Sequence, residues 1–111
     1  MTINKYLNDN YLHDSLVEKV TYENNVVDIT IDFCFWMQPG YHDKKPETGI
    51  IHLRFPDVVS VTGPLGDIDD YSILEAVFQG GCLTLLLMDD FNNTTYELKI
   101  VSETGNVEVC Y

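Results

Sequence analysis

Short segments in which apolar and polar residues alternate constrain the fold of this sequence more than any other feature. The clearest segment runs from Val27 to Phe35, where every second residue is apolar and the residues between include Asp28 and Asp32. A period of two is that of a β-strand with one buried and one solvated face. Asn24-Asn25 precedes it, and asparagine tolerates the positive φ of a two-residue hairpin turn. The pattern therefore predicts antiparallel strand pairs.

Further strands are predicted from the same alternation and from turn residues between the segments. Residues 72–79 fit a strand or a short helix, and the following Gly80-Gly81 favours a strand that enters a hairpin. Residues 82–88 are apolar on both faces, which indicates a central strand. In the first segment, Leu16, Val20 and Tyr22 are predicted to share one face. The remaining predicted strands cover residues 15–23, 50–55, 57–62, 94–101 and 107–111.

The whole chain, residues 1–111, is predicted to form a single all-β domain with a minor α component. Six to eight short antiparallel strands at regular spacing indicate a β-sandwich or an open barrel. Ile3, Tyr6 and Leu7 have helical spacing, so a short N-terminal helix is expected against one end.

The charge excludes several classes of partner. The chain has 18 Asp and Glu against 6 Lys and Arg, a net charge of −12. Nucleic-acid binding depends on basic contacts to phosphate, and this chain has one arginine, Arg54. An anionic membrane surface is disfavoured for the same reason, and no apolar run has the length of a membrane span. The N-terminal residues lack an apolar signal core, so a cytoplasmic protein is expected.

The three cysteines, Cys34, Cys82 and Cys110, are odd in number and widely spaced. This spacing favours free thiols buried as small hydrophobic groups, with a redox role, a single disulfide or a metal site as alternatives. No cofactor is expected.

The histidines form no recognisable catalytic pattern. His13-Asp14 and His42-Asp43 are adjacent pairs, and neighbours in a strand point to opposite faces, so neither is expected to act as a dyad. No nucleophile, zinc or phosphate-binding motif is present, and we expect a protein without catalytic activity.

Acidic residues are concentrated in one half of the chain. No Lys or Arg occurs between Phe55 and Leu98, whereas that stretch has eight acids. A net charge of −12 exceeds the magnitude of about 2 to 8 that solubility of a small domain needs. Fast capture of a basic partner is one use for such a field. The predicted binding residues are two acidic turns and two nearby aromatic residues: Asp67, Asp69, Asp70, Asp89, Asp90, Trp36 and Tyr41.

Two alternatives apply to these residues. The turn from Asp67 to Asp70 has the oxygen ligands that calcium prefers, but it lacks the glycine and distal glutamate of an EF-hand, so a solvated turn is the preferred interpretation. Trp36 is predicted on the solvated face of its strand, where the loop from Met37 to Thr48 or the N-terminal segment is more favoured to cover it than a partner.

The segment from Leu12 to Val17, Leu-His-Asp-Ser-Leu-Val, is followed by two alternating strands. It resembles the start of small bacterial β-rich domains, some of which are immunity proteins of polymorphic toxin systems. The segment Ile73–Phe78 with Leu83–Leu87 is similar to their second half. The resemblance implies a β-rich fold and a cytoplasmic binding role, and it transfers no catalytic residue.

The sequence therefore predicts a non-enzymatic acidic domain that binds a basic protein, in its most concrete form an immunity-type inhibitor of a basic toxin. One alternative is a module that forms homodimers through the edge strand at residues 107–111. The other is a ligand-binding or metal-binding domain that uses Trp36, Tyr41 and His42 around a cleft.

Overall fold

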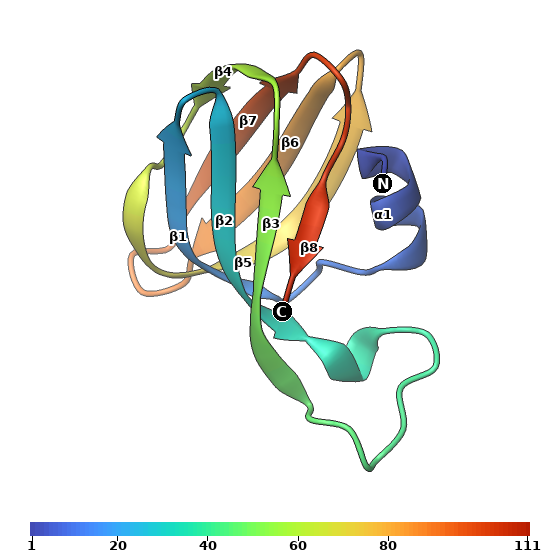
Figure 1. Cartoon of the computed structure of the whole chain (residues 1–111). Helices are drawn as coiled ribbons and strands as arrows, with labels where there is room; N and C mark the ends of the chain where they lie inside the picture. Colours follow the sequence, from blue (N-terminus) through green and yellow to red (C-terminus); the bar gives the residue numbers. More distant parts are fainter.

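Eight antiparallel strands form one sheet in a computed structural model that describes all residues, Met1–Tyr111 (Figure 1). The order across the sheet is β4-β7-β6-β5-β1-β2-β3-β8, with β4 and β8 at the edges. The predicted all-β class with a short N-terminal helix is confirmed. The elements are α1 (Ile3–Asp9), β1 (Leu16–Glu23), β2 (Val26–Cys34), the 3-10 helix η1 (Phe35–Met37), β3 (Thr48–Phe55), β4 (Val58–Thr62), β5 (Gly66–Gln79), β6 (Cys82–Asp89), β7 (Thr94–Ser102) and β8 (Glu108–Cys110).

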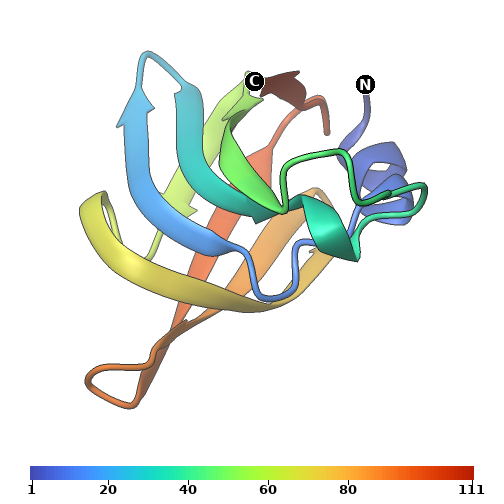
Figure 2. The same cartoon turned by 90° about the horizontal axis from the view of Figure 1, so that it is seen from below.

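The sheet curls on itself, so the open barrel rather than a two-sheet sandwich describes it (Figure 2). The long strand β5 is shared by the two halves. Its first part, from Gly66 to Ser72, pairs with β1, and its second part, from Ser72 to Gln79, pairs with β6. The inward faces of both halves enclose one cluster of 21 buried apolar residues.

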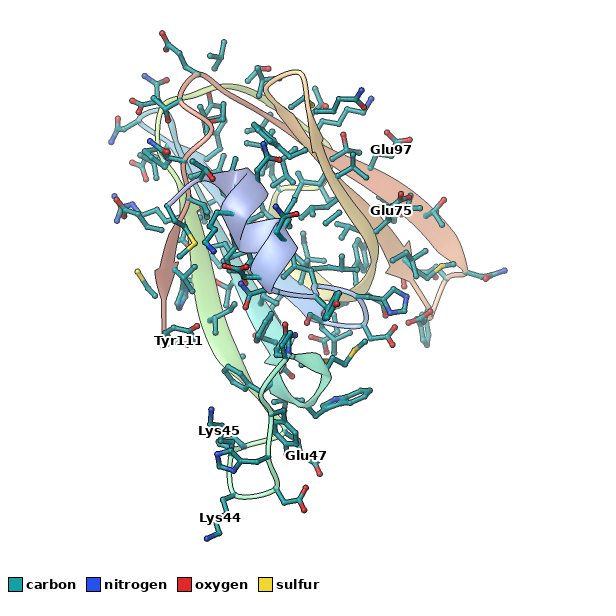
Figure 3. The ribbon with its side chains drawn as sticks, turned by 90° about the vertical axis from the view of Figure 1, so that its right-hand side faces the viewer. Lys44, Lys45, Glu47, Glu75, Glu97 and Tyr111 are labelled. Carbon is teal, nitrogen blue, oxygen red and sulfur yellow. The ribbon has the colours of Figure 1, made fainter.

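Helix α1 covers the open side of the barrel between β8 and the β5–β6 hairpin (Figure 3). The hydroxyl of Thr2 caps the helix by accepting from the Lys5 backbone N–H at 3.1 Å. Ile3 and Tyr6 are buried in the core. The Ile3 N–H donates to the carbonyl of Gly105 at 2.8 Å, which fixes the helix to the segment before β8. No helix has the length and apolarity to cross a membrane.

A β-bulge changes the predicted face of β1. The register between β1 and both of its neighbours shifts between Val17 and Lys19. Because a bulge inserts one extra residue, Val17 and Val20 are both fully buried, whereas Tyr22 is exposed and Leu16 is only half-buried. Tyr22 lies opposite the buried Val27 and so shares the face of Val20, whereas Leu16 lies opposite Asp32 on the other face. The prediction that all three share one face was therefore wrong for Leu16.

The predicted turns at both hairpins are confirmed. Asn24 and Asn25 have φ values of 52° and 62°, as a two-residue hairpin of this kind requires. Gly80 and Gly81 have φ values of 60° and 75° between β5 and β6, which confirms that residues 72–79 form a strand. Strand β6 lies inside the sheet between β5 and β7, as its apolar sequence predicted.

The side chain of Ser15 joins two parts of the sheet at the entry to β1. It is fully buried, and its Oγ accepts from the Cys34 backbone N–H at 3.0 Å. Its backbone carbonyl accepts from the Ile73 N–H at 2.9 Å. Ser15 therefore satisfies backbone N–H groups of two other strands where the chain enters β1.

The cysteines differ in exposure, and all three are free thiols. Cys34 is buried at the end of β2, Cys82 is half-buried, and Cys110 is exposed on the edge strand β8. The prediction that all three are buried holds only for Cys34, because the other two lie on the outward side of their strands.

We expect Gly63→Ala to destabilise the protein much more than Gly40→Ala. Both glycines have positive φ, which costs an alanine about 1–2 kcal/mol. A Cβ at Gly63 would lie 2.4 Å from the Glu97 carbonyl oxygen and 2.9 Å from the Leu98 Cα, whereas a Cβ at Gly40 meets nothing within 4 Å. With overpacking added, the total loss for Gly63→Ala is about 2–5 kcal/mol. Urea denaturation of both variants measures the difference, and equal losses would contradict the close approach.

Candidate partner-binding site

The predicted acidic residues of the first cluster lie on a strand rather than in a turn. Asp67 and Asp69 belong to the first part of β5 and are exposed on either side of the buried Ile68. Asp70 has a φ of 51°, and three residues of β5 stand opposite the single residue Glu18 of β1 at this point. The prediction of a turn was wrong because this bulged segment still pairs with β1 on both sides of the irregularity.

The structure brings Asp67 and Asp69 of the first cluster and Asp89 of the second together around one groove of about 450 Å³. Asp70 and Asp90 do not line it. Strand β5 pairs with the end of β6, and Ser72 lies opposite Met88, so the β6–β7 turn lies beside the first part of β5 (Figure 2). The groove is lined by Asp67, Ile68, Asp69, Tyr71, Asp89, Phe91 and Asn92.

Asp89 fixes the turn at one wall of the groove. Its carboxylate accepts from the backbone N–H groups of Phe91 and Asn92 at 3.1 and 3.2 Å, and from the Asn92 side-chain amide at 2.7 Å. The bond from the Asn92 side chain, followed by the backbone bonds, holds the pKa of Asp89 below its ordinary value against the opposing effect of desolvation. Asp89 is therefore a structural anion, and 5% of the residue is exposed.

Asp90 closes the other side of the same turn. Its carboxylate accepts from the Ser72 hydroxyl on β5 at 2.8 Å. This bond ties the turn to the strand that it faces, so the groove has two walls that are connected by hydrogen bonds as well as by the sheet.

Two aromatic features accompany the carboxylates. Phe91 is 96% exposed at the tip of the β6–β7 turn, an unusual position for a large apolar side chain. Tyr71, which lines the groove, stacks on Tyr96 with ring centroids 5.2 Å apart. Burial raises the pKa of Tyr71, and the charges of Tyr96, Asp89 and Asp69 raise it further. The Tyr71 hydroxyl therefore stays protonated at neutral pH.

Negative charge extends from the groove along β1. Desolvation raises the pKa of Glu18, and repulsion from Asp70 and Asp32 adds to that rise. Such repulsion indicates that these carboxylates are close enough to interact. No lysine or arginine lines the groove. On the outer face of the same half, Glu75 and Glu97 lie in one row across β5, β6 and β7 (Figure 3).

The geometry gives no support to the calcium alternative. No group of three or more His, Cys, Asp or Glu side chains is arranged to hold a metal ion. The carboxylates of the first cluster are spread along an extended strand, and those of Asp89 and Asp90 are engaged in the turn.

Trp36 and Tyr41 do not line the groove. Trp36 lies on η1, after the end of β2, and is 50% exposed, so the prediction that the loop or the N-terminus covers it was wrong. Tyr41 lies in the loop that projects from the barrel, where Lys44 is at the tip, and its hydroxyl donates to the Lys45 carbonyl at 3.2 Å (Figure 3).

The cleft predicted around Trp36, Tyr41 and His42 is lined by other residues in the structure. A cavity of about 350 Å³ does adjoin this loop, but none of these three residues lines it. The lining residues are Asn10, Phe33, Phe35, Gln38, Lys45, Pro46 and Tyr111.

His13 and Asp14 contact each other, although neighbours in a strand would point to opposite faces. His13 Nδ1 lies 3.3 Å from Asp14 Oδ2. Asp14 has a φ of 66° in the turn before β1, so the rule for adjacent strand residues does not apply. Both side chains are half-exposed and line no common site with a nucleophile.

Three residues of the groove were not predicted from the sequence: Tyr71, Phe91 and Asn92. The sequence did place a turn at residues 89–93, and this turn could have drawn attention to Phe91 and Asn92. The position of Tyr71 beside Asp89 depends on the register of β5 against β6, which the alternation of apolar and polar residues does not specify.

Comparison with family models, with curated proteins and with solved structures found no match to this chain. The fold and the groove therefore carry the functional argument on their own.

Acidification tests the role of Asp89. Because its pKa is lowered in the folded protein, its carboxylate stabilises the fold above the ordinary Asp pKa of about 4, and this contribution is lost as the pH falls through the lowered value. We expect wild type to melt above Asp89→Asn at pH 5–7, and the gap to close as the pH falls below the ordinary Asp pKa of about 4.

Thermal melts across this range measure the gap, and Asp43→Asn in the exposed loop is the matched control. A difference between wild type and Asp89→Asn that does not change with pH would contradict the assignment.

Proposed function

We propose that this protein acts by binding a basic protein through the acidic groove, as an immunity-type inhibitor of a basic toxin. The observation that supports the proposal is the junction of two acidic clusters, distant in sequence, around one groove with a fully exposed phenylalanine at its rim. No catalytic step is required of any residue.

Electrostatics favours a cationic partner. Asp67 and Asp69 are exposed and carry no ion pair, so a lysine or arginine that enters the groove meets free carboxylates. Like charges in one place destabilise the compact protein, and a bound cation relieves that repulsion. Complementary fields of this kind raise the rate of association more than the affinity itself.

The aromatic residues of the groove add apolar contact area to the electrostatic attraction. Phe91 offers apolar area that a partner can bury, and aromatic side chains are frequent anchors of interfaces. The rings of Phe91 and Tyr71 also suit an arginine, whose guanidinium stacks on aromatic faces and bonds to carboxylates. A toxin that cleaves nucleic acid carries such basic residues at its active site, and an acidic domain bound there would block it.

Charge reversal tests the choice of surface. The variant Asp67→Lys/Asp69→Lys leaves Asp70 in place because of its positive φ. We expect its association rate with the basic partner at low salt to fall about tenfold or more, since steering contributes factors of that order. The partner is first isolated by affinity capture at low and high salt, and rates are then measured by stopped flow.

The matched control is Asp43→Lys/Glu103→Lys, which changes the net charge by the same amount on exposed residues away from the groove. We expect it to alter the rate much less. Phe91→Ala is expected to raise the dissociation rate and leave the association rate nearly unchanged. Equal association rates for both charge variants would eliminate the groove as the binding surface.

Self-association is a second candidate, and the open edge of β8 favours it. Strand β8 pairs with β3 on one side only, and an unpaired strand edge is a template for a second copy. We expect a homodimer of this kind to show a mass that rises with concentration in light scattering. A monomer mass over the whole range from micromolar to millimolar would eliminate it.

A further inference from the structure

A cysteine, a histidine and an aspartate occupy neighbouring positions on the outer face of β2, β3 and β8, far from the groove in the sheet order. Thr30 of β2 lies opposite His52 of β3, and His52 lies opposite Cys110 of β8. Directly opposed residues share one face of a sheet, so the three side chains form one row. The neighbouring Leu53 is buried, which confirms that this row faces outward.

The imidazole of His52 has a fixed orientation. Its Nδ1 lies 3.2 Å from Asp28 Oδ1 and 3.3 Å from Thr30 Oγ1. A carboxylate accepts only, so the contact with Asp28 assigns the proton of the neutral ring to Nδ1. The lone pair is then on Nε2, on the part of the ring directed away from this contact, and Nε2 makes no hydrogen bond to the protein.

Cys110 has the thiol whose proton the Nε2 lone pair of His52 can accept. Opposed residues of an antiparallel pair have Cβ atoms about 4.5–5.5 Å apart, which places the Cys110 thiol within reach of the ring after a side-chain rotation. Cys110 is exposed, whereas Cys34 is buried and its thiol donates to the Asp14 carbonyl at 3.4 Å.

Carboxylates outnumber cations on the sheet face that carries the row, but both cations lie close to it. Arg54 of β3 lies opposite both Asp28 and Glu108, and Lys19 of β1 lies opposite Thr30. The cations on this face are therefore Lys19 and Arg54, and the carboxylates are Glu23, Asp28, Asp32, Asp67 and Glu108. The two cations lie within the row or beside it, so a thiolate at Cys110 is not surrounded by carboxylates alone.

We propose that Cys110 is a thiol-modification site that reacts with low-molecular-weight disulfides, with His52 as the base and Asp28 as the positioning residue. His52 Nε2 takes the thiol proton, and the Cys110 thiolate attacks one sulfur of the disulfide. A protein–small-molecule disulfide forms as the original S–S bond breaks, and the released thiolate takes the proton from His52. The site does not depend on the proposed partner-binding function.

The test is the rate of adduct formation at Cys110 with glutathione disulfide, measured on the full chain by mass spectrometry from pH 6 to 9.5. The thiolate is the reactive form, and an unassisted thiol is only a few per cent ionised at neutral pH. We expect His52→Gln to slow the reaction about tenfold at pH 7. The rates should converge near pH 9.5, where the thiol is ionised without a base.

Asp28→Asn is expected to fall between wild type and His52→Gln, with the same convergence at high pH. His13→Gln is the matched control, because it removes the other histidine that contacts an aspartate and leaves the row intact; its rate should equal that of wild type. Circular dichroism confirms the fold of each variant. The proposal is overturned if wild type and His52→Gln react equally at pH 7, if their rates differ by the same factor at every pH, or if the adduct forms at Cys34 or Cys82.

Discussion

The change of partner within β5 is the constraint on which the rest of the structure depends. At Ser72 the strand is opposite Leu16 of β1 on one side and Met88 of β6 on the other. A continuous backbone thereby closes two halves of the sheet around one core. The φ of 51° at Asp70 and the extra residues opposite Glu18 let the strand bend there.

The same bend forms the groove. It turns Ile68 inward and leaves Asp67 and Asp69 exposed on either side, while the pairing with β6 carries the Asp89 turn to the same end. Because Asp89 and Asp90 are held by hydrogen bonds from the turn and from Ser72, the exposed Phe91 is presented on a fixed backbone. A partner that binds it loses less freedom of the loop than it would with a mobile turn.

Local pattern predicted most of the fold and only part of the site. Alternation located β2 and the β5–β6 hairpin, since both depend on neighbouring residues and on turn chemistry. The face predicted for Leu16 in β1 was wrong because a bulge at Glu18 is set by two neighbouring strands. The acids of the groove were identified by their charge, but the place of Tyr71 and the row of Thr30, His52 and Cys110 depend on strand register, which no local pattern encodes.

The uneven distribution of charge along the chain places acidic and basic residues on different parts of the folded molecule. Strands β4, β5 and β6 contain no lysine or arginine, whereas α1, β1, β3 and the loop with Lys44 and Lys45 carry five of the six basic residues. The molecule therefore has an electric dipole in addition to its net charge. In the field of a cationic body the dipole produces a torque that rotates the groove toward that body before any atoms touch. A mutation far from the groove that reduced this dipole would slow productive encounters even with the contact surface unchanged.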